Sequence, residues 1–483
     1  MIFNSFAFWL FFAVVLLPYY TAFRNKGKAQ NLWLLLASYF FYGYANWKMI
    51  PLLVIVTIVF HQLGLRIEKD NEHAPKRASR LTTLGVVLGI GVLVYFKYLG
   101  FLVQEFAALL QALGFHVSIP VLKIVMPVGI SFFTFKLISY VLEVYRGRME
   151  AVKDIVSFGT YVAFFPTILS GPIDRPGEFI PQLEQSRRID YEGVAEGFRR
   201  FVWGLFLKLC LADRITAYPN AVFGNVAYHN TTSILLAAIL YAVEIYADFA
   251  GYSEMAIGVS RILGLKVREN FRRPIFAQNI SEYWSRWHMS LTSWLTDYVY
   301  MPLNVAFRDW GKWGIYLATC INVILIGMWH GADWTFLLFG VYHSIFLVLI
   351  AAVEKKRKKF EKKNKLKDKW WYRSPRMLIT FLIVVAGLVI FRAKDFSDLC
   401  AIVRQCGNGF GPVFTNGLLE IGSLGLLSLV VLFFKELKDE KGWNIHFLHS
   451  PKPWIRVLSM ALLAAFILFA GELKGASFIY FQF

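Results

Sequence analysis

Apolar segments recur along the whole chain, and short polar stretches rich in lysine and arginine separate them. Most of these segments approach the roughly 20 residues that a helix needs to cross a bilayer. Short strands of alternating apolar and polar residues, which would indicate a membrane barrel, do not appear. The pattern therefore predicts an all-α polytopic membrane protein. We expect helices at residues 2–23, 32–44, 50–65, 81–103, 121–145, 194–212, 234–250, 314–328, 335–353, 377–391, 418–434 and 455–470.

Three further segments are expected to be re-entrant or interfacial, and the first of them is residues 105–116. Residues 158–169 form a short segment that contains Pro166, and the segment around Ser290 is treated in the same way, which leaves about twelve crossings. The first apolar helix has no charged leading region and no cleavage site, so we expect it to be retained. No internal repeat or soluble boundary is visible, and residues 1–483 are interpreted as one domain.

Composition and charge narrow the class of protein further. Hydrophobic residues make up 57% of the chain and charged residues 17%, whereas soluble proteins carry about a quarter charged residues. The net charge of +19 comes from lysines and arginines in short loops between apolar helices. This distribution favours cytoplasmic loops beside anionic lipid over a groove for nucleic acid.

One basic segment fixes a predicted topology. Residues 354–376 contain twelve lysines and arginines against three acids, which predicts a cytoplasmic loop. Counting crossings from this loop leaves the final residues outside and places five other basic loops inside, at Arg24, Arg66, Arg146, Arg187 and Arg268. His330 then lies at the opposite end of its helices, whereas His288 lies in a segment that derives from the cytoplasmic side. The histidines therefore suggest a site that receives one substrate from each side.

The polar and aromatic stretch at residues 244–334 is the candidate site. Histidines and charges at membrane depth are functional candidates by default, because they are costly to place there. His288 and His330 each lie beside Trp, Arg or Gly in a region expected to break helices, and structural hydrogen bonding is their alternative role. His61 and His343 lie on apolar helices, and their positions favour packing or hydrogen bonding over catalysis.

Several chemistries lack their sequence signature. The metal motif HExxH, the nucleophile motif Gly-x-Ser-x-Gly and the phosphate-binding glycine loops are absent. The four cysteines form no CxxC pair and are interpreted as small buried side chains. We therefore expect no metal and no permanently bound cofactor. A histidine that removes a proton from a hydroxyl suits acyl transfer from a thioester to an alcohol.

Several motifs resemble the membrane-bound O-acyltransferase (MBOAT) family. They are DFAGYSEMAIG at 248–258, NFRRP at 270–274, EYWSRWHMSL at 282–291, WLTDYVYMPL at 294–303, GMWHG at 327–331 and, typical of a bacterial polysaccharide branch, SGPIDRPGEF at 170–179. The similarity runs over nearly the whole chain. The pattern is most similar to the alginate O-acetyltransferase subgroup, with peptidoglycan O-acetyltransferases and teichoic-acid D-alanylation proteins as related branches.

The resemblance implies a fold and an activity. The fold would be a ring of about 11 to 12 transmembrane helices, with re-entrant or interfacial helices, around a central tunnel. His330 would be the main catalytic histidine and His288 the second. The donor would be cytoplasmic acetyl-CoA or another acyl thioester, and the acceptor an extracytoplasmic polysaccharide, acetylated together with a secreted O-acetyltransferase partner. The location would be the inner (cytoplasmic) membrane of a bacterium, in contact with membrane lipid.

Arginines and tryptophans of these motifs are candidates for binding the donor. Guanidinium groups suit the phosphates of coenzyme A, and the candidates are Arg175, Arg272, Arg273 and Arg286, with Arg268 as a further one. Positive-inside topology explains the same arginines without a ligand. Trp284 and Trp329 are expected to wall the tunnel, or else to pack between helices.

The chain ends in FIYFQF at residues 478–483. This run resembles the end of the short partner peptide of the D-alanylation system. We therefore expect Tyr480 to accept the acyl group, with His330 as base, and to pass it to a secreted transferase. A phenol is a better leaving group than an alkyl alcohol, which favours such a relay. The alternative is an aromatic anchor at the membrane surface.

Three other functions stay open from the sequence. They are D-alanyl transfer to teichoic acid, transport without acyl chemistry, and a non-catalytic scaffold for polysaccharide synthesis. A transporter usually shows related halves or paired broken helices, and neither is visible. The tyrosine motif lies within this chain and not on a separate peptide, which favours acetylation over D-alanylation. The identity of the polysaccharide is open.

Overall fold

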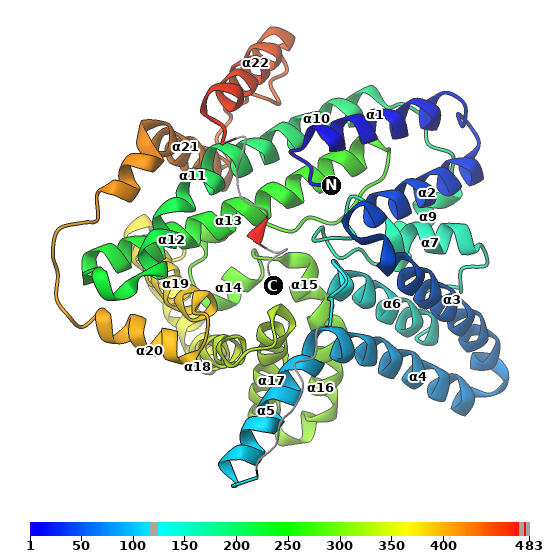
Figure 1. The fold of residues 1–483 in the computed structure, drawn as a ribbon, viewed down its shortest axis with the longest axis horizontal. Coiled ribbons are helices and arrows are strands. Elements are labelled where there is room, and N and C mark those ends of the chain that lie inside the picture. Colours follow the sequence, from blue (N-terminus) through cyan, green and yellow to red (C-terminus); the bar gives the residue numbers. More distant parts are fainter. Residues whose placement is uncertain (116–123, 473–477, 480–483) are drawn as a thin grey trace. The chain divides into compact units, whose positions relative to one another are not determined.

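Helices form all the regular structure of the described chain (Figure 1). The computed structural model describes residues 1–115, 124–472 and 478–479. Within these ranges the backbone forms α-helices, short 3-10 helices and π-helical turns, and no β-strand occurs. The all-α fold predicted by the apolar pattern is therefore confirmed.

The helices divide into two compact units. Unit 1 comprises Met1–Phe201 and Met255–Arg268, and unit 2 comprises Val202–Glu254 and Glu269–Phe483. The helices of unit 1 are α1 (Phe6–Tyr20), α2 (Gly27–Asn46), α3 (Ile50–His73), α4 (Pro75–Leu93), α5 (Leu99–Ala112), α6 (Ile130–Tyr145), α7 (Ile155–Ala163), α8 (Pro176–Phe179) and α9 (Pro181–Glu184). The single-domain interpretation stays a prediction.

Unit 2 contains most of the helices in the second half of the chain. They are α11 (Asp213–Ile215), α12 (Ala217–Gly224), α14 (Ile280–Trp284), α15 (Met289–Leu295), α16 (Met301–Ala306), α17 (Lys312–His330), α18 (Trp334–Lys363), α19 (Trp370–Arg392), α20 (Phe396–Gln405), α21 (Asn416–Lys441) and α22 (Pro453–Ala470). Two helices, α10 (Tyr191–Leu205) and α13 (Thr231–Ile262), contribute residues to both units.

Seven helical stretches of the described chain are long and apolar enough to cross a membrane. Two of them, Gly27–His73 and Pro75–Ala112, each contain two α-helices joined by a short helical turn. The other five are Thr231–Ile262, Lys312–His330, Trp334–Lys363, Trp370–Arg392 and Pro453–Ala470. A helix satisfies its own backbone hydrogen bonds and is therefore stable in lipid. The protein is a multi-pass membrane protein.

The outer faces of these helices are apolar. On α22, the side chains of Val457, Leu462 and Phe469 are largely exposed. Leaving such side chains in water costs about 1.5–3 kcal/mol each relative to burial. Contact with lipid acyl chains removes that cost, so the exposed apolar surface fits a membrane environment.

The segment expected to be re-entrant is a short helix followed by buried turns. Helix α7 ends at Ala163, and the chain then turns through Ser170 with every residue buried. The buried Lys136 of α6 donates to the carbonyl oxygen of Tyr161 at 3.1 Å and to the Thr167 hydroxyl at 2.9 Å. These bonds pair polar groups inside the protein, as non-helical backbone at membrane depth requires.

Helix α13 does not end near residue 250, as the sequence pattern predicted. It continues to Ile262 through the polar run that begins at Asp248. The reason is that the charge of Asp248 is paired inside unit 2. The buried Lys208 of the π-helical turn η3 (Phe206–Ala212) lies 2.7 Å from Asp248 and 2.9 Å from Asp213. A paired carboxylate does not need to leave the helix to find water.

The glycine of this polar run serves packing and does not break the helix. A β-carbon at Gly251 would lie 2.9 Å from the carbonyl oxygen of Gly204, on α10. Only glycine allows two helical backbones to approach so closely. Gly251 therefore permits close packing of α13 against α10 within unit 2.

The basic segment that was predicted to be a loop is largely helical. Helix α18 continues to Lys363, and α19 begins at Trp370. Glu354 and Lys358 form an ion pair of 2.8 Å one helical turn apart. Pairs at this spacing stabilise a helix by about 0.2–0.5 kcal/mol each. The positive charge is therefore carried mainly on a helical extension of the span.

Candidate functional site

His288 occupies an unusual backbone position between α14 and α15 of unit 2. Its φ of 44° lies in the left-handed region, which residues with a β-carbon seldom adopt. The side chain is completely buried. A left-handed residue costs on the order of 1–3 kcal/mol and persists where its surroundings fix it, often at functional sites. The backbone therefore marks His288 independently of its chemistry.

Asn270 sets the orientation of the His288 ring. The side-chain oxygen of Asn270 lies 3.0 Å from Nδ1 of His288 and accepts from the Ser290 hydroxyl at 2.9 Å. An amide oxygen can only accept, so Nδ1 carries the hydrogen and Nε2 keeps the lone pair of the neutral ring. The Asn270 amide group in turn donates to the Ser253 hydroxyl of α13 at 3.0 Å. This network presents His288 as a base at Nε2.

Two motif segments pair through their backbones. The N–H of Met289 donates to the carbonyl oxygen of Asn270 at 2.9 Å, and the N–H of Arg272 donates to that of Arg286 at 2.9 Å. These bonds hold the NFRRP motif beside the WSRWH motif. The pairing places the Asn270 side chain against His288.

One tryptophan contacts both candidate histidines. His330 is the last residue of α17, and its side chain is buried. The ring of Trp329 lies 4.9 Å from the ring of His330 and 5.6 Å from the ring of His288, edge to face in both cases. Phe249 of α13 also contacts His288, at 4.7 Å between ring centres. The structure thus gathers three of the predicted site residues into one aromatic cluster.

Close packing of α17 against α18 fixes the backbone near His330. A β-carbon at Gly327 would collide with the carbonyl oxygen of Phe336, and one at Gly340 would lie 2.7 Å from the α-carbon of Ile324. Glycine at both positions lets the helices approach closely. His330 lies three residues beyond Gly327, so this contact positions its imidazole.

Two neighbouring cavities adjoin these residues in unit 2. The larger has a volume of about 210 Å³ and mainly apolar walls, with Glu436 among the few polar residues that line it. The smaller has a volume of about 10 Å³ and is lined by His330, His343, Trp284 and other aromatic and aliphatic side chains. The two share four lining residues, which are Tyr283, Trp287, Val384 and Leu388. Because the cavities share these walls, the larger cavity lies directly beside the one that contains His330.

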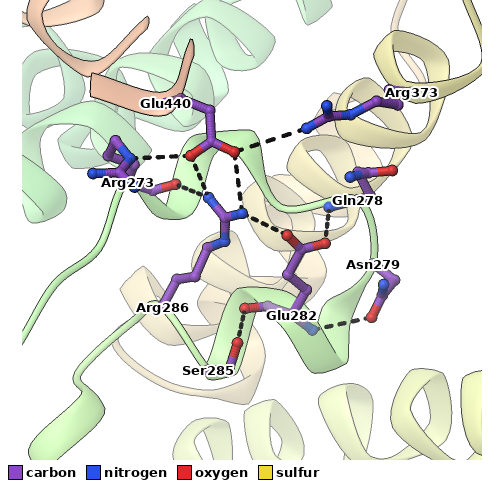
Figure 2. Close-up of polar contacts among 8 residues, drawn as sticks. All are labelled: Arg273, Gln278, Asn279, Glu282, Ser285, Arg286, Arg373 and Glu440. Carbon is purple, nitrogen blue, oxygen red and sulfur yellow. Dashed lines mark hydrogen bonds and ion pairs between the residues drawn. The ribbon is translucent and has the colours of Figure 1, made fainter. Parts of the chain in front are cut away.

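Glu440, near the end of α21, gathers three arginines (Figure 2). Its carboxylate accepts from both terminal nitrogens of Arg286, at 2.9 and 3.2 Å, and from Nε of Arg273 at 3.0 Å. Arg373 lies 3.8 Å away, and Arg286 also pairs with Glu282 at 2.6 Å. Three guanidinium groups against two carboxylates leave this Glu440 cluster with a net positive charge.

The arginines of the Glu440 cluster shift the pKa of the Glu440 carboxyl. Burial by itself raises the pKa of the Glu440 carboxyl, but the hydrogen bonds and charges of Arg286 and Arg273 lower it further, so the pKa lies below its ordinary value. Glu440 is therefore ionised at neutral pH. Arg273 and Arg286, two of the predicted phosphate-binding residues, are held by this carboxylate and brace the segment that carries His288.

Comparison with known proteins decides the family. A sequence model of the MBOAT, membrane-bound O-acyltransferase family matches residues 151–373, which include both histidines of the aromatic cluster. The chain is also 35% identical to the probable alginate O-acetylase AlgI of Azotobacter vinelandii, over 82% of this chain and 76% of that relative. The chain belongs to the membrane-bound O-acyltransferase family. It is a membrane O-acyltransferase.

Two other relatives of this acyltransferase act on different polymers, to judge from their names. The peptidoglycan O-acetyltransferase of Helicobacter pylori is 27% identical over 96% of this chain and 93% of that protein. The teichoic acid D-alanyltransferase of Bacillus subtilis is 31% identical over 56% of this chain and 69% of that protein. All three relatives are named for acyl transfer, so acyl transfer in the modification of the cell envelope is the activity that they share.

The remaining predicted site residues of the acyltransferase lie elsewhere. Arg175 is buried in unit 1, directly before α8. Arg272 is exposed, and only its backbone joins the pairing described above. Tyr480 lies outside the described residues. Among the residues that the structure describes, no group of three His, Cys, Asp or Glu side chains is arranged to hold a metal ion.

Sequence reasoning missed two residues that support the site of the acyltransferase. Asn270 lies within the NFRRP motif, where it is the only side chain able both to accept and to donate, and that feature could have identified it. Glu440 lies 154 residues from Arg286 along the chain, and no sequence pattern connects the two. His343, interpreted as a packing residue, lines the same small cavity as His330.

Proposed function

We propose that this acyltransferase moves an acetyl group from acetyl-CoA, or from another acyl thioester, in the cytoplasm to a polysaccharide outside the bacterial inner membrane. The observation that carries the proposal is the aromatic cluster, in which Trp329 contacts both His288 and His330 beside a cavity. This geometry occurs in a chain similar to an alginate O-acetylase. Two imidazoles that contact the same indole ring suit proton transfer during acyl transfer.

His330 acts as the general base of the proposed reaction. Its imidazole takes the proton of the acceptor hydroxyl, and the oxygen then attacks the thioester carbonyl carbon. The new carbon–oxygen bond forms first, the carbon–sulfur bond then breaks, and the leaving thiolate takes the proton from His330. His288 assists through Nε2, which the hydrogen bond to Asn270 keeps available as a proton acceptor.

The donor is proposed to bind from the cytoplasmic side at the Glu440 cluster. The predicted topology puts the C-terminal end of α21 on that side. The cluster keeps a net positive charge, so phosphates of the donor compete with Glu440 for Arg273 and Arg286. Arg272, which is exposed and adjacent to Arg273 in the chain, adds a further guanidinium group. Trp284 and Trp329 wall the path from there to the histidines.

The acyl group is proposed to reach a secreted partner transferase through Tyr480. The residue before it, Ile479, donates its backbone N–H to the Asp248 carboxylate at 2.8 Å. The ring of Phe478 is buried and lies 4.4 Å from the Lys208 ammonium group. The chain directly before Tyr480 is thus held within unit 2, the unit that also contains both histidines. This contact supports a relay over a free surface anchor.

D-alanyl transfer is the second candidate function, and the similarity to a teichoic acid D-alanyltransferase favours it. The two functions differ in their donor. D-alanyl transfer uses an aminoacyl thioester, whereas acetylation uses an acetyl thioester. Thioester turnover with acetyl-CoA but not with a D-alanyl thioester supports acetylation.

The deciding experiment measures release of free thiol from acetyl-CoA by the purified protein. We expect turnover with the unchanged protein and its loss in the variant His330→Ala. Size-exclusion chromatography checks that both proteins are folded. Turnover that survives in His330→Ala contradicts the proposed base, and no turnover in either protein favours a transporter or a scaffold.

A second measurement tests the relay. Tyr480→Phe keeps an aromatic anchor and removes the hydroxyl. We expect hydrolysis of acetyl-CoA, in which water accepts the acetyl group and free thiol is released, to persist. Acetylation of the polysaccharide should be lost. Mass spectrometry of the intact protein after incubation with acetyl-CoA checks for an acetyl group on Tyr480. Normal polysaccharide acetylation by Tyr480→Phe would rule the relay out.

A further inference from the structure

A third histidine shares the small cavity with His330. His343 lies on α18, is almost completely buried and lines the cavity together with Trp284 of α14. The rings of His343 and Trp284 are in edge-to-face contact, with 5.3 Å between their centres. The cavity therefore has His343 and Trp284 in its wall beside His330, together with the polar rings of Tyr283 and Trp287.

The rings of His343 and Trp284 each have a buried polar atom without a hydrogen-bond partner in the described part of the chain. These atoms are Nδ1 of His343 and Nε1 of Trp284. The other ring nitrogen of His343 faces α19, where a β-carbon placed at Gly387 would lie 2.5 Å from Nε2. A buried polar atom that stays unpaired loses its hydration without compensation, so two such atoms on residues that line one cavity point to a group bound there. The indole nitrogen can only donate, so this bound group has to be an acceptor.

The size of the cavity restricts what that group is. A volume of about 10 Å³ matches about one water-sized sphere. The cavity holds a single oxygen atom but not an acyl chain. The neighbouring cavity of about 210 Å³ has mainly apolar walls and suits the chain that carries that oxygen. A carbonyl group at the boundary of the two cavities satisfies both requirements.

We propose that Trp284 and His343 bind the carbonyl oxygen of the acyl group while it is transferred at His330. The proposal rests on the proposed function and adds two binding residues to it. When the acceptor oxygen attacks the carbonyl carbon, the electron pair of the carbon–oxygen double bond moves onto the carbonyl oxygen. N–H groups of Trp284 and His343 stabilise that negative charge. The double bond then re-forms, the carbon–sulfur bond breaks and the thiolate takes the proton held by His330.

Aromatic packing alone is the competing explanation. His343 contacts the ring of Phe339 at 4.6 Å and that of Tyr342 at 5.3 Å, so an aromatic hydrocarbon side chain would fill its place. Packing predicts that phenylalanine replaces His343 without loss of rate. Binding of the carbonyl oxygen predicts that phenylalanine fills the space but lowers the rate of the chemical step.

The test compares His343→Phe and Trp284→Phe with two control variants. His61→Phe replaces another buried histidine on an apolar helix, in unit 1, and Trp203→Phe replaces a buried tryptophan that stacks on Phe206. Release of thiol from acetyl-CoA is measured for each purified protein, with melting temperature as the folding check. Removing one donor to a developing negative charge lowers kcat by about 10²- to 10³-fold. We expect that loss for His343→Phe and Trp284→Phe, with KM little changed, and no loss for the controls.

The outcomes separate this inference from the proposed function. If His330→Ala abolishes turnover but folded His343→Phe and Trp284→Phe keep kcat within about twofold, the proposed function stands and the carbonyl site is wrong. If His330→Ala keeps turnover, the proposed function itself fails. The variant His343→Gln supplies an N–H donor that phenylalanine lacks, so it should recover part of the rate lost in His343→Phe. Packing alone does not predict this recovery. Should His343→Phe not fold, Trp284→Phe decides.

Discussion

The orientation and protonated nitrogen of the His288 ring are determined by an asparagine 18 residues earlier in the chain. Asn270 fixes the ring and the protonated nitrogen, and the hydroxyl of Ser253 fixes Asn270. A sequence indicates histidine as a candidate base because of its chemistry. Which of its nitrogens is available depends on a contact that only the folded chain makes. The candidate residue was therefore predictable, but its orientation was not.

The variant Ser253→Ala tests this support. It removes one hydrogen bond behind Asn270, so the His288 ring is held less firmly and we expect a lower kcat. Loss of a hydrogen bond of about 0.5–1.5 kcal/mol corresponds to a decrease of about 2- to 12-fold. Thiol release from acetyl-CoA is the measurement. The matched control is Ser260→Ala, because Ser260 lies on the same helix and bonds only within it, to the carbonyl oxygen of Ala256. An equal decrease in both variants would contradict the role of Ser253.

Glu440 predicts a dependence of stability on pH. Burial alone raises the pKa of its carboxyl, but Arg286 and Arg273 lower it below the ordinary value of 4.5. A carboxyl with a lowered pKa stabilises the folded state above its ordinary pKa, and this stabilisation is lost as the pH falls through the folded-state value. We expect Glu440→Gln to lower the free energy of unfolding by about 1–3 kcal/mol at pH 7. The difference from the unchanged protein should shrink below about pH 4.5.

Melting temperatures in detergent across this pH range provide the measurement. Glu192→Gln, at an exposed glutamate of α10, serves as the control and should leave the curve unchanged. If the melting temperatures of Glu440→Gln and the unchanged protein differ by the same amount from pH 7 down to pH 3.5, charge pairing does not stabilise the cluster.

At the scale of elements, apolar runs located most helices but not where they end. Helix α17 was expected at residues 314–328 and extends from Lys312 to His330, where Gly331 is the C-cap residue. Helix α13 was expected to end near residue 250 and continues to Ile262. The difference arises because the partner of Asp248, Lys208, lies 40 residues away in the chain. Local patterns predict a helix, whereas distant partners decide whether a charged turn stays helical.

The close contact between α17 and α18 predicts that one added methyl group lowers both stability and activity. The variant Gly327→Ala forces the added carbon against the carbonyl oxygen of Phe336, so the helices have to separate and His330 moves. Overpacking of this kind destabilises a protein by about 1–3 kcal/mol. We expect a lower melting temperature and a lower kcat. Gly91→Ala on α4 is the control, because no atom lies within 4 Å of its added carbon. A normal rate and melting temperature for Gly327→Ala would show that this contact does not position His330.

At the scale of the whole molecule, the family predicted from the sequence is confirmed, the catalytic role of the two histidines stays a prediction, and the structure adds the residues that surround them. His288, His330 and Trp329 belong to motifs of contiguous residues, so they could be recognised from the sequence. Glu440 is a single acid near the end of a distant helix, and His343 is one residue in an apolar run. Residues of this kind acquire a role only through tertiary contacts, which no local pattern encodes.

The membrane topology is the last prediction, and a native cysteine tests it. The basic extension of α18 is expected inside the cell, so the single crossing by α19 carries α20 to the outside. Cys400 lies on α20 and is exposed, so the expectation that all four cysteines are buried was wrong for this residue. Lys362 lies in the basic extension and is also exposed. A membrane-impermeant maleimide should therefore label Cys400 in cells whose outer barrier has been removed. The triple variant Cys400→Ser, Cys406→Ser, Lys362→Cys, which also removes the partly exposed cysteine at the end of α20, should react only after the inner membrane is opened. Labelling in the reverse pattern would invert the topology and would put the Glu440 cluster on the side away from cytoplasmic thioesters.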